Sequence, residues 1–294
     1  MIIETKYMHH LLKILCIIIF TLSLSSHAFA DDGDDDDDGK DNEQQTYQIT
    51  DSIDLVPTVN FQYAKPKIVI KSTYPRLVGE ETDDHIDEFN TLVQAILKEE
   101  IASFKDRVIQ AQMVQQKAAL AKLKNELVID FATSILNTTK SPIISVRFSI
   151  QGYITPQAHP YHYHRVLNYD LASGLPIELA ELFKPDANYL AVLADYSRKI
   201  LDKKLEDKQF ILAGTAPTSE NYKNWNLKPS GLLITFDEYQ VAPYVYGTQT
   251  VLIPYAVLND LFATDSPLGL CLKNKRKCLR NNVLTGGFMD ELVS

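Results

Sequence analysis

A run of alternating residues near the middle of the chain constrains the fold more than any other part of the sequence. Every second residue from Ile144 to Ile150 is a large apolar one, and the residues between them are Ser145, Arg147 and Ser149. A period of two is typical of a β-strand with one buried face. Gly152 and the prolines at 156 and 160 then end the strand, because proline cannot donate to a sheet ladder.

The same stretch continues with a second extended segment and a short helix. The extended pattern resumes over Arg165–Leu171, and Ala172-Ser173-Gly174 predicts a tight turn. Pro176 suits the first turn of a short helix that carries Leu179, Leu182 and Phe183. Residues 141–183 therefore predict two strands and a helix around which the rest of the chain is arranged.

Two longer helices are expected on either side of this stretch. An apolar stripe at helical spacing runs from Ile86 to Val108, and a second helix is expected from about Asp186 to Leu205. Further strands are expected at 67–74, 127–131, 232–236 and 250–253, with a long irregular connection over 206–230. We interpret the fold as α+β, an antiparallel twisted sheet with two long helices packed on one face.

The N-terminus has the pattern of a secretory signal peptide. Lysines precede the apolar run Leu15–Phe20, and Ala28-Phe29-Ala30 fits a signal-peptidase site. Residues 31–45 hold nine acidic residues and one lysine, which predicts a disordered acidic linker. We therefore expect a secreted or periplasmic protein with no membrane span after cleavage.

The remaining chain is expected to divide into three parts. Residues 46–140 form an N-terminal α+β subdomain, 141–263 a C-terminal α+β domain, and 264–294 a tail. Cys271 and Cys278 enclose a basic loop in this tail, and an even pair so close in an oxidising compartment predicts a disulfide.

Three motifs in the chain resemble those of a bacterial envelope domain of unknown function. They are A-H-P at 158–160, N-Y-D-L-x-S-G-L-P-I-x-L-x-x-L-F at 168–183, and F-x-x-Y-x-V-A-P-Y-x-x-G at 236–247. The domain is found in lysozyme-sensing anti-sigma factors and as an accessory region of peptidoglycan deacetylases. Upstream, Tyr74-Pro75 and Phe89-Asn90 resemble its usual N-terminal partner domain, so the resemblance covers roughly residues 65–263. It implies ligands such as peptidoglycan or a lysozyme-like protein.

Three histidines are the candidates for a metal site. In an extended strand His162 and His164 point to one side, and His159 lies in the preceding turn. No cysteine or distant carboxylate is identifiable as a further ligand, and the resemblance implies only His159. Tyr161 and Tyr163 interleave with these histidines, so we interpret His159, Tyr161, His162, Tyr163 and His164 as ligand-contact or structural residues rather than metal ligands.

The tetrapeptide Thr235–Glu238 approaches the T-F-D-D motif of metal-dependent polysaccharide deacetylases. Those enzymes place the motif before a histidine pair on a barrel, whereas here the histidines come first and no eightfold strand–helix pattern exists. We interpret the tetrapeptide as a strand end that leads into the loop 239–247. Tyr239, Tyr244 and Tyr246 crowd this loop and are candidates for carbohydrate stacking or contact with a protein partner.

The sequence thus predicts a non-enzymatic binding module of the cell envelope, with no cofactor, no bound metal, no catalytic residues and no nucleic-acid partner. The ligand is expected to be a cell-wall glycan or a lysozyme-like protein. The alternative is a metal-dependent envelope hydrolase or deacetylase that uses His159, His162 and His164.

Overall fold

The strand–turn–strand stretch lies at the centre of a large sheet, in a computed structural model that describes residues 46–65, 67–79, 84–115, 124–138, 142–269 and 280–284. These residues belong to one compact unit, 44–294. The predicted signal peptide, the acidic linker and the Cys271–Cys278 pair lie outside the described residues.

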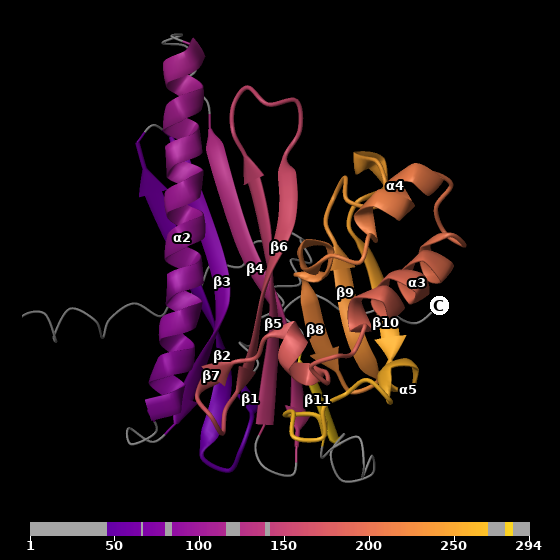
Figure 1. The fold of residues 1–294 in the computed structure, drawn as a ribbon. Helices are drawn as coiled ribbons and strands as arrows, with labels where there is room; N and C mark the ends of the chain where they lie inside the picture. Colours follow the sequence, from indigo (N-terminus) through magenta and orange to yellow (C-terminus); the bar gives the residue numbers. More distant parts are fainter. Residues whose placement is uncertain are drawn as a thin grey trace, which may run out of the picture. The chain divides into compact units, whose positions relative to one another are not determined.

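The main sheet contains eight strands. Neighbouring strands in it are antiparallel, except for the parallel pair β3 and β4 (Figure 1). Along the sheet the order is β1-β2-β3-β4-β5-β6-β7, and β11 also pairs with β4. The strands are β1 (Tyr47–Gln48), β2 (Ile53–Ala64), β3 (Ile68–Gly79), β4 (Asn125–Asn137), β5 (Pro142–Tyr153), β6 (Tyr161–Asp170), β7 (Leu175–Pro176) and β11 (Arg280–Leu284).

Helix α2 (Asp84–Gln115) connects the two parallel strands and covers one face of the main sheet. Its buried residues follow the stripe expected from the sequence: Phe89, Val93, Leu97, Phe104 and Val108 are at most 4% exposed. The side chain of Asn90 bonds both the backbone N–H and the C=O of Leu77, each at 2.9 Å. This pairing satisfies the backbone of β3 beyond the residues where β4 accompanies it.

A second, three-stranded sheet packs on the opposite face. It consists of β8 (Trp225–Lys228), β9 (Gly231–Phe236) and β10 (Gln249–Pro254), all antiparallel. Ile135 and Ile144 belong to the core under α2, whereas their chain neighbours Leu136 and Ile143 belong to the core of the second sheet. Because neighbouring residues of a strand point to opposite faces, the main sheet is the layer between the two cores.

The α+β class is confirmed, but the expectation of two long helices on one face is wrong. Helix α3 (Tyr189–Leu201) is shorter than predicted and packs against β10 of the second sheet. Its amphipathic stripe predicts that it buries one face, but the stripe does not say which sheet it will bury that face against.

The region 206–230, expected to be irregular, contains α4 (Lys208–Gly214), the 3₁₀ turn η3 (Ser219–Tyr222) and strand β8. The short helix expected after Pro176 is the 3₁₀ turn η2 (Leu179–Leu182), and α5 (Tyr255–Leu258) follows β10. The expected domain boundary at 140 falls between β4 and β5, which pair along their whole length. Buried apolar residues from Ile177 onward all belong to the core of the second sheet, which Leu136 and Ile143 of the main sheet also join.

The N-Y-D-L-x-S-G motif has structural contacts throughout. Tyr169 is fully buried against Phe89 and donates its hydroxyl to the backbone oxygen of His85 at 2.7 Å. Asp170 accepts from the backbone N–H of Ala172, and Gly174 has φ +70°, a conformation that favours glycine. The turn thereby fixes the end of β6 to the start of α2.

Candidate functional site

Strand β6 sends its two sets of side chains to opposite faces of the main sheet. Tyr161, Tyr163 and Arg165 face α2, where Arg107 stacks on the Tyr161 ring at 4.4 Å. The hydroxyl of Tyr163 donates to the buried carboxylate of Glu100, which also accepts from Arg165 at 2.8 Å. Tyr161 and Tyr163 thus bind the strand to the helix and lie on the opposite face from the histidines with which they alternate.

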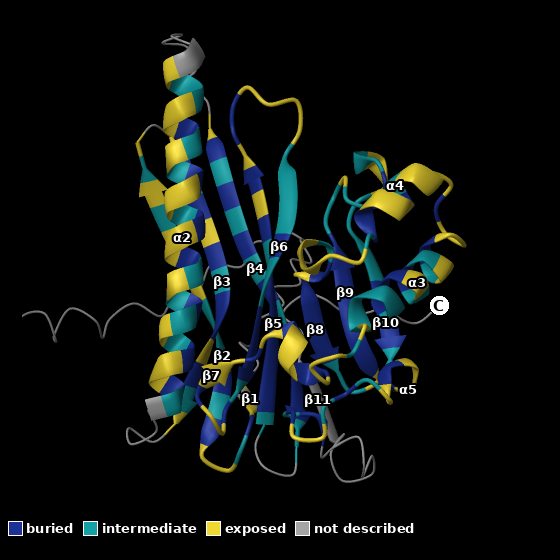
Figure 2. Ribbon diagram, in the orientation of Figure 1, coloured by how far each residue is buried: buried dark blue, intermediate teal, exposed yellow. Residues whose placement is uncertain are grey.

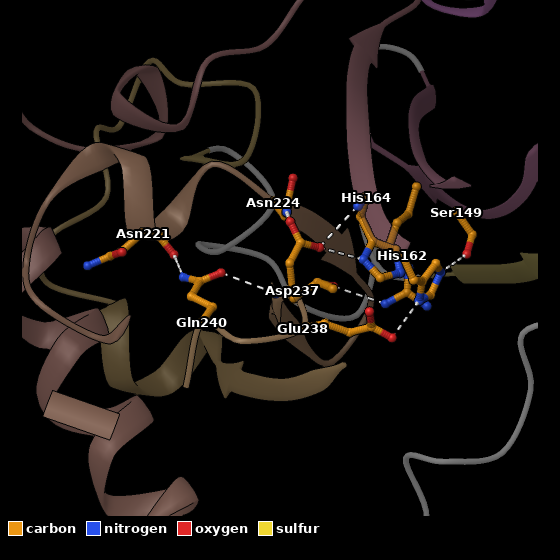
Figure 3. A network of polar contacts seen from close by, with 10 residues as sticks. Ser149, His162, His164, Asn221, Asn224, Asp237, Glu238 and Gln240 are labelled. Atoms are coloured by element: carbon orange, nitrogen blue, oxygen red, sulfur yellow. Dashed lines mark hydrogen bonds and ion pairs between the residues drawn. The ribbon is translucent and has the colours of Figure 1, made fainter. Parts of the chain in front are cut away.

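His162 and His164 share the other face, with ring centroids 4.7 Å apart. His164 is 2% exposed, and both its backbone N–H and its Nδ1 donate to Oδ1 of Asp237, at 3.0 and 2.7 Å. Nε2 of His162 lies 2.6 Å from the hydroxyl of Ser149, and its Nδ1 lies 3.9 Å from Glu238. The two histidines therefore join β6 to the end of β9 (Figure 3).

Asp237 is held from its other side as well. Asn224 donates to Oδ2 at 2.9 Å, and the backbone N–H of Asp237 donates to Gln240 at 3.1 Å. Gln240 in turn donates to the backbone oxygens of Gly214 and Asn221 (Figure 3). The carboxylate is thus the centre of a polar network that fixes the loop after β9 to both sheets.

Burial sets the protonation of this network. Desolvation, with a smaller contribution from the nearby His164, lowers the pKa of His162 to about 4. Desolvation also lowers the pKa of His164, although the bond to Asp237 opposes this shift, and burial raises the pKa of Glu238. Both imidazoles are neutral at physiological pH, and Nε2 of His164 has no hydrogen-bond partner among the described residues.

An exposed aromatic surface lies over this network, and we call His159, Tyr239, Tyr244 and Tyr246 the aromatic rim. The rings of His159 and Tyr244 stack with centroids 4.1 Å apart, and Tyr239 lies 5.6 Å from Tyr244. His159 donates from Nδ1 to the backbone oxygen of Pro160, and the hydroxyl of Tyr244 donates to that same oxygen at 3.3 Å. Tyr239 and Tyr246 are 53% and 45% exposed, so the rim presents ring surface to solvent.

The three histidines do not converge on one point. His159 lies against Tyr244, whereas His162 and His164 bond to Ser149 and Asp237. Within the described part of the chain, no group of three or more His, Cys, Asp or Glu side chains is disposed to hold a metal ion. The arrangement places the partly exposed rings of the rim against one another.

A separate hollow of about 380 Å³ lies between the β6–β7 turn, η2 and residues 263–267. Asp170, Glu181 and Asp265 contribute acidic side chains to its lining, together with Leu175 and Phe183. None of the site residues expected from the sequence lines it.

The sequence interpretation missed the carboxylate partners of the histidines. Asp237 is 73 residues from His164 along the chain, so no local spacing indicates the pair. The one available signal was the Thr235–Glu238 strand end, whose acidic residues follow a buried strand. Those residues meet the histidine strand, although no distant carboxylate was identifiable from the sequence.

Part of the second core matches a known protein family. Residues 180–256 match the family model described as "Protein of unknown function (DUF3298)". This match covers η2, α3, the second sheet and the loop that carries Tyr239, Tyr244 and Tyr246. The resemblance inferred from the sequence motifs is therefore confirmed by a match to the DUF3298 model over residues 180–256.

Two curated relatives come from Bacillus subtilis (strain 168). The chain is 24% identical over 259 residues to the peptidoglycan-N-acetylmuramic acid deacetylase PdaC, covering 87% of this chain and 50% of PdaC. It is 27% identical over 181 residues to the anti-sigma-V factor RsiV, covering 58% of this chain and 59% of RsiV. The chain thus spans between half and three-fifths of the length of these relatives.

A crystal structure of a DUF3298 family member from Bacteroides fragilis has a similar fold, with a TM-score of 0.52 at 18% identity. The match covers 75% of this chain and 96% of the other. No helix in the described residues is long and apolar enough to cross a membrane.

Proposed function

We propose that this chain is an extracytoplasmic, non-enzymatic binding module of the bacterial cell envelope, whose aromatic rim binds the glycan strand of peptidoglycan. The observation that carries the proposal is the stacked pair of an exposed His159 and a half-buried Tyr244, close in the chain to the buried His164–Asp237 bond. Aromatic rings that are already ordered lose little conformational entropy when a ligand stacks on them.

The chemistry of the rim suits a sugar chain. The apolar faces of pyranose rings stack on aromatic side chains, while their hydroxyls need hydrogen-bond partners at the edges. Around the rim these partners are the hydroxyls of Tyr239 and Tyr246 and the partly exposed carboxylate of Glu238. Rings with polar groups beside them match an amphipathic ligand better than a wholly apolar one.

The relatives support the envelope setting. PdaC acts on peptidoglycan by its name, and this chain corresponds to half of its length. A module that holds the polymer beside a separate catalytic part explains why the histidine network here is buried and neutral. The predicted signal peptide is consistent with the same location.

The direct test is binding of purified chain, from residue 46 onward, to insoluble peptidoglycan and to soluble N-acetylglucosamine oligomers. We expect Tyr244→Ala to weaken binding by about tenfold to a hundredfold, because it removes the central ring of the rim. Leu212→Ala is the matched control, since Leu212 is 61% exposed on α4 and lies outside the rim. Binding that is absent in the wild type, or unchanged in Tyr244→Ala, would refute the proposal.

A lysozyme-like protein is the second candidate ligand, and one observation favours it. Val245 is 84% exposed between Tyr244 and Tyr246, and an apolar side chain at the tip of a loop suits a protein surface. Val245→Asp separates the two candidates: it should weaken capture of lysozyme and leave binding of sugar oligomers unchanged.

A further inference from the structure

The second sheet covers only part of the face of the main sheet that lies opposite α2, which we call the outer face. Along β5, Ser145 bonds to Asn226 and Arg147 to Thr235, so these residues lie under the second sheet. Ser149 bonds to His162 at the edge of that cover. The next residues on the same face, Gln151 and Tyr153, are exposed.

The strand register continues this uncovered face across the sheet to β2. Two rows of paired residues cross it, as follows from the pairing of β2 with β3, β3 with β4, β4 with β5, and β5 with β6. The first row is Phe61, Lys71, Val128, Gln151 and His162, and the second is Tyr63, Val69, Glu126 and Tyr153.

The outer half of these rows exposes large apolar side chains. Val59, Phe61 and Tyr63 alternate along β2 and are 42%, 57% and 76% exposed, and Tyr153 is 36% exposed. The arrowhead end of β2 has the colours of exposed and intermediate residues in Figure 2. Two of these rings have polar neighbours in the rows: the Lys71 amine lies 6.0 Å over the ring of Phe61, and Tyr153 is paired with Glu126. Tyr63 is paired with Val69, and Val128 lies between Lys71 and Gln151. The rows therefore mix rings and two valines with an amine, an amide and a carboxylate.

The first row ends at the candidate site. His162 is its last residue, and the carboxylate of Glu238 beside His162 also lies within the electrostatic reach of His159. From β2 to β6 the row crosses four strand spacings, which is about 19 Å. A track of exposed and half-buried side chains thus runs from the edge of the sheet to the aromatic rim.

We propose that the outer face from β2 to β6 is an extended subsite for the same glycan strand, so that the rim holds one end and Phe61 and Tyr63 the other. This proposal rests on the proposed function of the rim. The mixed chemistry of the rows favours a polymer of sugar rings over a second copy of the chain, because a stable protein interface needs a contiguous apolar centre. Because the first row ends beside the rim, we expect the glycan strand to run from the rim toward β2.

The test measures affinity against ligand length. Wild-type chain should bind a β-1,4-linked N-acetylglucosamine hexasaccharide about tenfold more tightly than the disaccharide, because only the longer ligand reaches the added ring contacts. The double variant Phe61→Ser with Tyr63→Ser should keep disaccharide affinity and lose this gain. Gln151→Ala, in the middle of the first row, should lose part of this gain in affinity for the hexasaccharide. Leu212→Ser, the control, should keep all of it.

The outcomes distinguish failure of the extended subsite from failure of the proposed function of the rim. If Tyr244→Ala weakens binding of every oligomer but the length-dependent gain is absent or survives in the double variant, the extended subsite is wrong and the rim stands. If wild-type chain binds no oligomer, the proposed function fails and the subsite fails with it. If sedimentation shows a dimer that the double variant abolishes, the face is an interface between copies, and the glycan track is overturned.

Discussion

At the scale of single residues, the buried contact between His164 and Asp237 determines how the candidate site is built. Nδ1 and the backbone N–H of His164 both donate to one carboxylate oxygen, so the side chain can hardly reorient without breaking two bonds. Sequence alternation indicates that His162 and His164 share a face. It cannot indicate the acceptor, because the acceptor comes from a different sheet.

The histidines predict a dependence of stability on acidity. The unfolded chain takes up a proton on His162 near its ordinary pKa of 6.5, whereas the folded chain does so only at about 4. Above the unfolded-state pKa, His162 therefore costs the folded state no stability. The loss of stability grows as the pH falls between the two pKa values and is constant below the folded-state pKa. We expect the free energy of unfolding to fall on the order of 2 kcal/mol over this window.

Urea unfolding at several pH values checks this expectation. His162→Gln should flatten the slope of unfolding free energy between the two pKa values. Equal slopes in wild type and His162→Gln would show that protonation of His162 does not cause the pH dependence of stability.

At the scale of elements, local patterns predict some parts of the chain much better than others. Helix α2 and strands β5 and β9 follow from their periodicity, because each buries an apolar face in a hydrophobic core. Strand β8 has only four residues and lies in a region without periodicity. It is held by tertiary bonds, such as those of Asn226 to Ser145 and Val146, which no local pattern encodes.

The end of α4 offers a test of how an element supports the rim. A Cβ at Gly214 would lie 1.9 Å from the backbone oxygen of Gln240, the residue that holds the N–H of Asp237. Gly214→Ala must therefore displace the loop, and we expect a loss of about 1 to 3 kcal/mol in unfolding free energy. Binding at the rim should weaken as well.

Ala213→Gly at the neighbouring position is the control for helix propensity, with an expected cost of about 1 kcal/mol or less and unchanged ligand binding. Gly214→Ala protein with wild-type stability and wild-type affinity would show that the loop does not depend on this close approach.

At the scale of the whole molecule, a buried polar network joins the two sheets. Ser145 donates to Asn168 at 2.5 Å and accepts from Asn226 and from the backbone N–H of Leu227, at 3.0 and 2.9 Å. Asn168 also donates to the backbone oxygen of Trp225. These bonds fix β8 against β5 and β6 in a single register, which apolar packing alone specifies less strictly.

Removing the central hydroxyl should therefore loosen the sheets. We expect Ser145→Ala to lower the unfolding free energy by about 2 to 4 kcal/mol, because several buried partners lose a bond at once. Ser134→Ala is a closely matched control: Ser134 is paired with Ser145 across the strands, is equally buried, and its hydroxyl has no partner among the described residues. Chemical denaturation of both variants should separate them clearly.

The expected disulfide also belongs to this scale. We predict that exported protein has no free thiol and that the bond between Cys271 and Cys278 contributes about 2.5 kcal/mol on the loop-entropy model. The strand β11, two residues further on, is part of the main sheet, so the pair precedes a segment that belongs to the fold. Thiol titration of unreduced, denatured protein tests this, and two free thiols would disprove it.

Strand β11 has a consequence for how the protein folds. It pairs with residues 133–137 of β4, on the edge that β3 leaves after residue 129, so this edge is completed by a segment that is distant along the chain. Until that segment docks, residues 133–137 present unpaired backbone groups to any neighbouring chain. Contacts between such distant parts of a sequence form slowly. A polypeptide that folds in one step avoids that exposed intermediate, whereas a copy that lacks Arg280–Leu284 would keep it.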